Sequence, residues 1–354
     1  MQKLSEQVEE CKGNVKELYK FFNSVTGARK PNPMPERSND EDLAEEFADF
    51  FLEKIINIRT ALDHLPSFIP RADEIGEFDH FESLTESEVE KVIMSMGSKS
   101  WEVDCMPTSI LKAVLPRVLP IITDIINKSL NQGDFVSSWK TAIIRPTLKN
   151  SSLDLVPTNY RPVSNLSFLS KVLEKTTLIQ FTKHYDENDL MPDYQSAYHK
   201  SYSCETALIK VVDDILWSME RQEGVALMAI DLSAAFDTVD HQILLSVLQA
   251  RFGITGKALQ WFRSYLYPRS CKVTVEGKYS TEKDLPFSVR QGSCMGPVLY
   301  LAYASTLKDA VPQNISLHGY ADDHAVKLSF DVKDPQAEIR AVRQLEYSAS
   351  EIND

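Results

Sequence analysis

Two adjacent acids near the end of the chain have surroundings that suit metal binding. Asp322 and Asp323 belong to the tetrapeptide at 320–323 (YADD), which lies between the apolar runs Ile315–Leu317 and Ala325–Phe330. Two carboxylates at the tip of a hairpin repel each other and shift each other's pKa. A hard divalent cation such as Mg²⁺ relieves this repulsion and binds carboxylate oxygens. The pair by itself is weak evidence, because adjacent Asp residues are common in solvated turns.

A third acid follows a different strand. Asp231 comes directly after the apolar run Val225–Ile230, which indicates a buried strand, and a helix is predicted to begin near His241. Ligands commonly bind beyond the ends of strands, so Asp231 is well placed for a metal. The alternative is that Asp231 caps a helix.

A segment rich in turn-forming residues lies between these acids, at 290–297 (RQGSCMGP). Its glycines allow backbone to approach a ligand closely. Ser293 is predicted to cap a helix that runs to about Ala310. Taken alone, this segment would be an ordinary loop.

In this order, the three segments resemble the reverse transcriptases of non-LTR (LINE-like) retrotransposons. The resemblance covers the chain from about residue 40 to its end. The matching blocks are 159–164 (NYRPVS), 195–198 (QSAY), 232–245 (LSAAFDTVDHQILL), 290–299 (RQGSCMGPVL) and 318–323 (HGYADD). Five blocks in the same order are a much more specific signal than any one of them.

The resemblance implies a metal site. It assigns two Mg²⁺ ions, for which Mn²⁺ could substitute, to Asp231, Asp322 and Asp323, with the backbone carbonyl of Leu232 as a further ligand. One ion would lower the pKa of the primer 3′-hydroxyl, and the other would neutralise the leaving pyrophosphate. Asp323 is the least direct ligand of the three.

The resemblance also implies a site for the incoming nucleotide. Phe236 would abut the sugar and exclude a 2′-hydroxyl, although the ring could instead belong to the core. Gln291 would contact the nucleotide, and Gly292 would let the backbone approach it. Lys149 and Arg161 would neutralise phosphate charge, the alternative being a solvated basic face.

The other residues with metal-binding side chains indicate structural roles. His241 and His324 have no second His or Cys at ligand spacing, and the family usually has a Thr-like residue where His324 stands. The five cysteines lack zinc-site spacing and predict reduced, intracellular thiols. They are Cys11, Cys105, Cys204, Cys271 and Cys294.

Length and composition limit the class of protein to which the chain can belong. The 354 residues are 43% hydrophobic, which is enough for two or three subdomains. With no apolar stretch of membrane-spanning length and no signal peptide, we expect an intracellular protein, nuclear or cytoplasmic, that makes no membrane contact.

A net charge of −13 argues against nucleic-acid binding, but the negative charge is unevenly distributed along the chain. Residues 1–100 hold 21 acids and 12 bases, whereas the remaining 254 hold 30 acids and 26 bases. Within this remainder, 140–183 has seven bases against two acids, and 251–290 has eight against three. These two basic stretches could track phosphates.

Periodicity predicts the secondary structure, and we find no internal repeat. The predicted helices are 1–25, 40–59, one from Thr85 with a capping-box pattern, 111–131, most of 162–184, 204–222, one or two within 245–266, and one from Asp334 to the end of the chain. The predicted strands are 139–148, 225–230, 272–275, 285–289 and the two that flank the YADD turn. A Pro-rich linker is predicted at 30–35.

These elements predict an α/β (α+β) fold, a right-hand polymerase with fingers and an antiparallel palm sheet backed by helices. We assign 1–100 to a helical N-terminal extension, 101–225 to a lead-in and the fingers, and 226–354 to the palm. The family's endonuclease would precede this segment. Its last palm strand and its thumb would follow, so the thumb is expected to be missing.

The predicted function is RNA-directed DNA polymerisation, with dNTPs added to a DNA primer on an RNA template during retrotransposition. The alternative is a truncated, non-catalytic retroelement remnant that at most binds RNA or protein. An RNA-templated RNA polymerase or an intron maturase is a third possibility, and Phe236 argues against the RNA polymerase because its ring should exclude ribose.

Overall fold

A computed structural model describes most of the chain. The described residues are 33–37, 39–60, 76–97, 103–198, 201–232 and 234–353. The helix predicted at 1–25 and most of the linker predicted at 30–35 lie outside them. The chain forms two compact units, each of which is described by itself. They are Met1–Ser38 with Thr147–Arg161, and Asn39–Pro146 with Pro162–Asp354.

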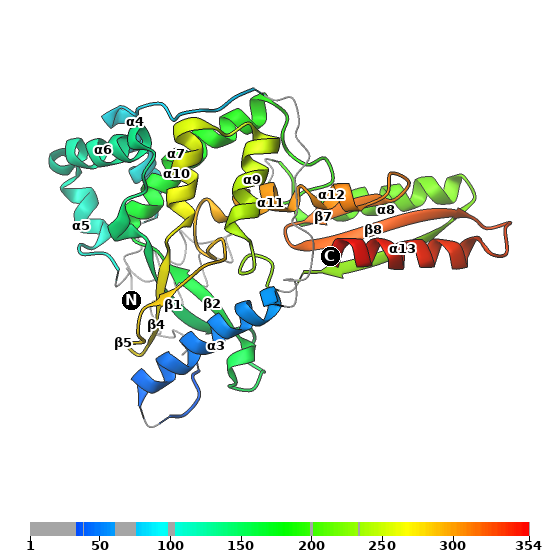
Figure 1. Cartoon of the computed structure of the whole chain (residues 1–354), viewed down its shortest axis with the longest axis horizontal. Coiled ribbons are helices and arrows are strands. Elements are labelled where there is room, and N and C mark those ends of the chain that lie inside the picture. The colour runs from blue at the N-terminus through cyan, green and yellow to red at the C-terminus, as the bar shows by residue number, and fades with distance from the viewer. Residues whose placement is uncertain are drawn as a thin grey trace, which may run out of the picture. The chain divides into compact units, whose positions relative to one another are not determined.

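Helices are the most abundant elements of the described chain (Figure 1). They are α3 (Asp40–Thr60), α4 (Glu86–Ser95), α5 (Thr108–Ala113), α6 (Leu115–Gln132), α7 (Phe168–Glu187), α8 (Cys204–Glu220), α9 (His241–Phe252), α10 (Gly256–Leu266), α11 (Gly296–Ala304), α12 (Leu307–Ala310) and α13 (Ala337–Asn353). None of these helices combines the length and the apolar character needed to cross a membrane.

The strands form two separate sheets. They are β1 (Thr141–Leu148), β2 (Tyr160–Asn165), β3 (Glu223–Asp231), β4 (Ser270–Val275), β5 (Lys278–Tyr279), β6 (Lys283–Asp284), β7 (Ser316–Tyr320) and β8 (Asp323–Asp331). One sheet has the order β2-β1-β4-β5, with β6 also paired to β4, and the other has the order β3-β8-β7. The protein is thus a mixed α/β structure.

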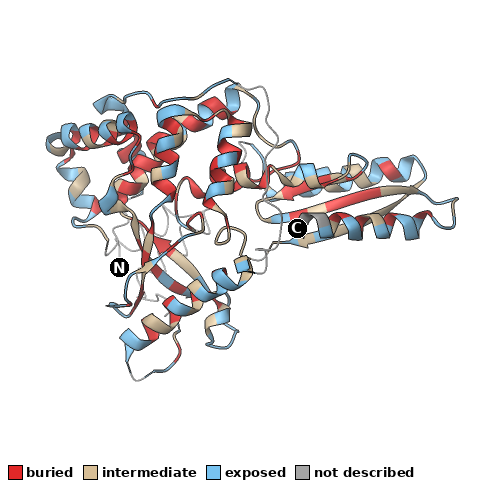
Figure 2. Ribbon diagram, viewed as in Figure 1, coloured by how far each residue is buried: buried red, intermediate tan, exposed pale blue. Residues whose placement is uncertain are grey.

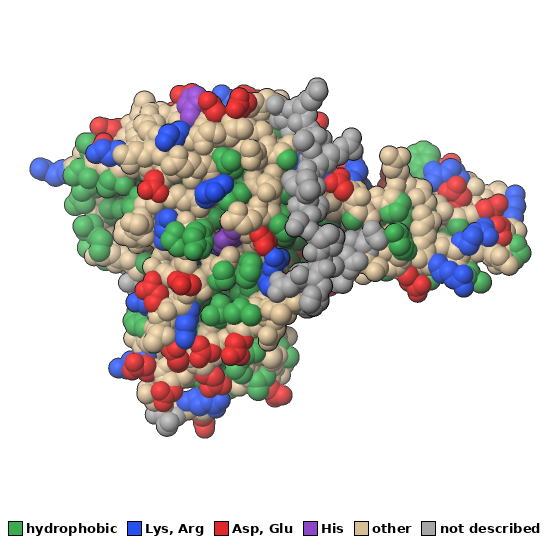
Figure 3. All heavy atoms as spheres, in the orientation of Figure 1, with side chains coloured by type: hydrophobic (Ala, Val, Ile, Leu, Met, Phe, Trp, Pro, Cys, Tyr) green, Lys and Arg blue, Asp and Glu red, His purple; other side chains and the backbone are tan. Residues whose placement is uncertain are grey.

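The five-stranded sheet is covered by α3. Strand β1 runs parallel to β4, and α3 packs on β4 and β5. Lys283 on β6 fastens this helix through ion pairs with Glu45 at 2.5 Å and Asp49 at 2.7 Å. Acidic side chains gather around α3, in the lower part of the surface view (Figure 3). This surface is therefore unsuited to a polyanion.

The largest hydrophobic core lies among the helices. Side chains from α4, α6, α7, α9, α10 and α11 pack together there, with Trp261 of α10 fully buried. Its ring packs edge-on against Phe81 and Phe135, and stacks on Tyr265 at 5.4 Å between centroids. Figure 2 shows this buried interior as the red faces of the helices.

A smaller core forms between the three-stranded sheet and α13. Val326 and Leu328 of β8 pack with Ala341 and Leu345 of α13. Side chains alternate along a strand, so Lys327 points to the opposite face and contacts α8. Figure 1 accordingly shows the strands between α8 and α13.

Several predicted elements are confirmed. Helices α3, α8 and α9, strands β1, β3 and β4, and the hairpin of β7 and β8 lie where the sequence patterns predict them. The capping box at Thr85 is formed, since its side chain accepts from the N–H of Glu88 while the Glu88 carboxylate accepts from the N–H of Thr85.

Other predicted boundaries are wrong, and local chemistry explains some of them. The strand predicted at 285–289 is not formed, because Pro286 has no N–H for a ladder and Ser288 has a φ of +97°. The helix predicted over most of 162–184 is present as α7, which begins at Phe168 after β2. The stretch 111–131 contains two helices that meet at Val114, and the helix predicted to run to Ala310 ends at Ala304.

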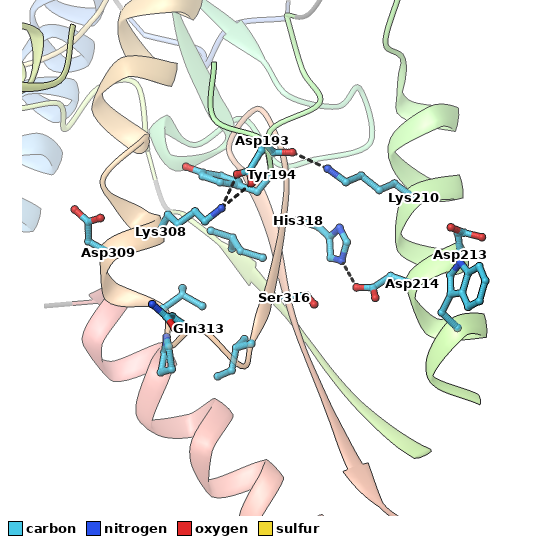
Figure 4. Close-up of a pocket in the computed structure, with 15 residues that line it drawn as sticks. Asp193, Tyr194, Lys210, Asp213, Asp214, Lys308, Asp309, Gln313, Ser316 and His318 are labelled. Carbon is cyan, nitrogen blue, oxygen red and sulfur yellow. Dashed lines mark hydrogen bonds and ion pairs between the residues drawn. The ribbon is translucent and has the colours of Figure 1, made fainter. Parts of the chain in front are cut away.

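A buried polar cluster joins α8 to the three-stranded sheet (Figure 4). The side chain of Lys327 is only 4% exposed, and its Nζ donates to Asp214 Oδ1 at 2.6 Å and to Ser218 Oγ at 3.0 Å. His318 of β7 contacts the other oxygen of Asp214 at 2.9 Å. Burial would raise the pKa of Asp214, but the hydrogen bonds from Lys327 and His318 outweigh it and lower that pKa.

We predict that Asp214→Ala lowers the free energy of unfolding by about 3 kcal/mol, because it leaves the buried ammonium of Lys327 without its counter-charge. Denaturant titration would measure this change. Asp213→Ala, on the exposed neighbour, should cost no more than about 0.5 kcal/mol. Adding Lys327→Met to Asp214→Ala should restore much of the loss, and equal costs for the two single variants would contradict the prediction.

Candidate active site

The three predicted metal-binding acids lie at one end of the three-stranded sheet. Antiparallel pairing puts Asp231, the last residue of β3, opposite Asp323, the first residue of β8. Asp322 precedes Asp323 in the turn after β7. Asp231 and Asp323 point to the same side of the sheet as Lys327, but both are exposed, so α8 does not cover this end.

The chemistry of these donors fits Mg²⁺, which prefers carboxylate oxygens. Directly opposed residues in an antiparallel pair have Cβ atoms roughly 4.5–5.5 Å apart. In the described part of the chain, however, no group of three or more His, Cys, Asp or Glu side chains is gathered closely enough to hold a metal. Like charges repel, so carboxylates brought closer together would need a counter-ion. Leu232, the other predicted ligand, follows Asp231 directly.

Gln195 holds the turn that carries the acids, a role that the sequence reasoning missed. Its side-chain Oε1 accepts from the N–H of Ala321 at 2.9 Å, and its Nε2 donates to the C=O of Ala321 at 3.2 Å. Ala321 has a φ of +57°, a conformation that costs a non-glycine residue energy. Gln195 is only 3% exposed, so its two bonds are shielded from water. The only sequence signal was its place in the block at 195–198.

The two histidines have the structural roles that the sequence analysis assigned to them. His324 is buried, and its Nδ1 lies 3.0 Å from the carbonyl oxygen of Asp322. Burial lowers the pKa of His324, so the ring is neutral near pH 7 and donates to that carbonyl. The Nε2 of His241 likewise contacts the carbonyl of Ser288, at 2.9 Å, and burial lowers the pKa of His241 as well.

Phe236 is half-buried, which allows both of its predicted roles. Its ring stacks on that of Tyr300, with centroids 4.5 Å apart and planes 23° apart. Burial chiefly, and then the negative charge of Asp322, raise the pKa of Tyr300. The carbonyl of Phe236 also accepts from the N–H of Val289 at 2.8 Å, which ties it to the segment leading to Gln291.

Gln291 and Gly292 form a turn against the end of β2. The carbonyl of Gln291 accepts from the N–H of Ser164 at 3.0 Å. Gly292 has a φ of +114°, and a Cβ there would collide with the carbonyl oxygen of Ser164. The glycine is thus required both by its backbone conformation and by the close approach of β2.

The two predicted phosphate-binding residues lie together in the other unit. Lys149 follows β1 and Arg161 is on β2, and both side chains are exposed. The Nζ of Lys149 donates to the carbonyl of Thr158 at 2.8 Å, and its N–H donates to the carbonyl of Asn159 at 2.9 Å.

Asp237 is a second residue that the sequence reasoning missed. With Gln291 and Ser164, it lines a cavity of about 30 Å³. Burial raises the pKa of Asp237 to about 6, against a smaller opposite effect of Lys54. No sequence pattern indicated this burial, and residues of α3 line the same cavity.

A larger cavity of about 1000 Å³ lies along the edge of β7, between α8 and the segment around α12 (Figure 4). Its lysines already have partners. Lys308 pairs with the carboxylate of Asp193 at 2.7 Å, and Lys210 donates to the carbonyl of Asp193 at 2.7 Å. Because these cations are engaged, the cavity is a poor site for a triphosphate.

Comparison with known proteins identifies the class. A family model described as reverse transcriptase (RNA-dependent DNA polymerase) matches residues 147–349, more than half of the chain. The match includes β3, the hairpin of β7 and β8, and the turn at Gln291. The chain belongs to the reverse transcriptase family.

Several of its relatives come from mobile elements of Drosophila melanogaster. The probable RNA-directed DNA polymerase from transposon X-element is 27% identical over 290 residues, which are 80% of this chain and 31% of the relative. The probable RNA-directed DNA polymerase from transposon BS is 30% identical over 68% of this chain and 28% of its own length. The RNA-directed DNA polymerase from mobile element jockey is 28% identical over 69% and 27%.

These similarities confirm the kind of reverse transcriptase that the motif blocks predict. The chain is a reverse transcriptase domain of the non-LTR, LINE-like type. It spans less than a third of the length of these relatives.

We predict that Gln195→Ala loosens the acidic turn and speeds hydrogen exchange of the Ala321 amide by tenfold or more, since losing a buried hydrogen-bond partner costs about 1–3 kcal/mol. Gln180→Ala is the matched control, because the Gln180 amide makes the same pair of bonds to the backbone of Glu82. Hydrogen exchange with mass spectrometry would measure both. Unchanged exchange at Ala321 in Gln195→Ala would contradict the assigned role.

Proposed function

We propose that this domain adds deoxynucleotides to the 3′-hydroxyl of a DNA primer, directed by an RNA template, as part of retrotransposition. One observation carries the proposal, namely the register that pairs Asp231 with Asp323 and sets Asp322 in the adjoining turn. Membership of the reverse transcriptase family supports it. In this proposal, the three-stranded sheet with α13 belongs to the palm, and β1 and β2 belong to the fingers.

The acids are proposed to hold two Mg²⁺ ions. Mg²⁺ bound by Asp231, Asp322 and Asp323, with the carbonyl of Leu232, would acidify the primer hydroxyl and neutralise charge on the leaving pyrophosphate. The protein's own contribution is to keep these carboxylates on one exposed end of the sheet. Gln195 supports that contribution by fixing the turn before Asp322.

The remaining predicted residues are proposed to bind the nucleotide. Gln291 and Gly292 offer an amide and an open backbone, while Phe236 faces the sugar with its ring braced by Tyr300. Lys149 and Arg161 provide the positive charge that a triphosphate requires. RNA template, DNA primer and dNTPs are therefore the expected partners.

We predict that Asp322→Ala reduces primer extension to background while the domain stays folded, because the carboxylate pair can no longer hold a cation. The assay is Mg²⁺-dependent extension of a DNA primer on an RNA template at low salt, since phosphate contacts weaken steeply as salt rises. Circular dichroism would confirm folding.

Asp213→Asn is the control for this variant, since it removes an exposed carboxylate from α8 and should extend normally. Extension that persists in Asp322→Ala would refute the metal assignment. No extension by a folded wild type would favour the alternative of a non-catalytic remnant.

We predict that Phe236→Ala raises incorporation of ribonucleotides relative to deoxynucleotides by about tenfold or more, because a ring in contact with the sugar would leave no room for a 2′-hydroxyl. Competitive incorporation of rNTP and dNTP measures this ratio. Tyr300→Phe, which keeps the stacked ring and removes a buried hydroxyl that has no hydrogen-bond partner among the described residues, should leave the ratio unchanged. An active Phe236→Ala enzyme with unaltered selectivity would assign the ring to the core.

A further inference from the structure

Helix α7 carries a carboxylate that is completely shielded from solvent. Glu174 has 0% exposure, although acidic residues are almost never fully buried unless they are paired. Removing a carboxylate from water is costly unless hydrogen bonds replace its hydration. The partners of Glu174 should therefore indicate what the residue is for.

Two of its three donors come from the loop between Gln291 and α11. The N–H of Cys294 donates to Glu174 Oε2 at 2.7 Å, and the hydroxyl of Ser293 donates to the same oxygen at 2.9 Å. The third donor is Tyr265 of α10, whose hydroxyl lies 3.2 Å from Oε1. Glu174 thus fastens a loop that is 120 residues away in the sequence.

Ser293 extends this anchor to the start of α11. Its Oγ accepts from the N–H of Met295 and of Gly296, both at 3.0 Å. It also lies 2.8 Å from the Tyr265 hydroxyl. Ser293 therefore supports the helix as predicted, and Glu174 in turn orients Ser293.

The other side of the turn is held by a buried cation. Arg290 donates from Nη2 to the carbonyl of Lys140 at 2.6 Å and to that of Ser270 at 3.0 Å. Burial, together with neighbouring Arg269, lowers the pKa of Arg290 to about 9, and the negative charge of Glu174 opposes this shift. Glu174 thus also provides counter-charge for two buried arginines.

Arg290 and Ser293 are buried, and only the two residues between them, Gln291 and Gly292, are at least partly exposed to solvent. Gly292 is exposed, Ser293 is buried, and β2 contacts the turn through Ser164. We propose that Glu174 is a positioning residue that holds the Gln291–Gly292 turn in place for the incoming nucleotide. This inference rests on the nucleotide-binding role given to the turn under the proposed function.

Cysteine alkylation tests the anchor without requiring catalysis. Burial, and then the charge of Glu174, raise the pKa of the half-buried Cys294 thiol to about 11, so it should react slowly at pH 8.5. Glu174→Gln puts an amide N–H₂ in place of one acceptor oxygen and should speed modification of Cys294 by about tenfold. Iodoacetamide labelling of the whole chain, read by mass spectrometry, gives the rate at each cysteine.

Two other cysteines report whether the effect is local. Exposed Cys204 should react equally in both proteins, and buried Cys271 should stay slow unless the fold opens as a whole. Faster labelling of Cys294 and Cys271 together would show general destabilisation and overturn the proposal. Unchanged labelling of Cys294 would overturn it as well.

Kinetics then test the link to the nucleotide. Glu174→Gln should raise the KM for dNTP by about tenfold and change kcat by less than about twofold, since the turn would bind substrate and not the reacting atoms. Tyr265→Phe removes the long bond to Oε1 and the contact with Ser293 Oγ but leaves both bonds to Oε2, so it should have a much smaller effect. Glu187→Gln, an exposed substitution on the same helix, should have none.

If KM and kcat change by similar factors in Glu174→Gln, and Tyr265→Phe behaves in the same way, Glu174 would be assigned to the core. If Glu174→Gln does not fold, Ser293→Ala is the substitute variant, because it removes the bond between Ser293 and Glu174 and should lower the stability of the fold less. It should show the same rise in KM and in the rate of Cys294 labelling. A wild-type domain that extends no primer would refute the proposed function, while the labelling rates would still decide whether Glu174 holds the turn.

Discussion

The pairing of β3 with β8 is the interaction on which the candidate active site depends. It aligns nine residues of each strand, from Glu223 opposite Asp331 to Asp231 opposite Asp323. A slip of one residue would turn the side chains of one strand to the other face. The two acids would then no longer share a side. The apolar contacts of Val326 and Leu328 with α13 oppose such a slip, so the hydrophobic packing on one face fixes the geometry of the carboxylates on the other.

The tight turn adds a second constraint. A hairpin of this length needs a residue with positive φ, and the chain uses Ala321 where glycine would be easier. The side chain of Gln195 stabilises this conformation from one side, and buried His324 binds the carbonyl of Asp322 from the other. The acids therefore stand on a backbone that is braced before any ligand arrives, which reduces the ordering cost of binding.

Two clusters of buried charged and polar side chains also orient the segments near the candidate active site. Lys327 with Asp214, and Glu174 with Ser293 and Tyr265, are each satisfied by partners from other elements. Such clusters give little net stability compared with apolar packing, but they tolerate few alternative arrangements. They lie behind the acidic hairpin and behind the Gln291 turn. In both places, a polar anchor inside the protein orients a segment whose reactive groups face outward.

Local pattern in the sequence determined the strand that ends at Asp231, the hairpin at Asp322 and the capping box at Thr85, because each depends on neighbours within a few residues. The order of five short blocks along the chain determined the family. Local pattern misjudged 285–289, where apolar alternation outweighed Pro286 in the prediction. The tertiary structure alone decided the register, the depth of Glu174 and the partner of Ala321, since each is a contact across 90 or more residues of chain. Periodicity shows which face of an element is apolar, but not which distant side chain will meet it.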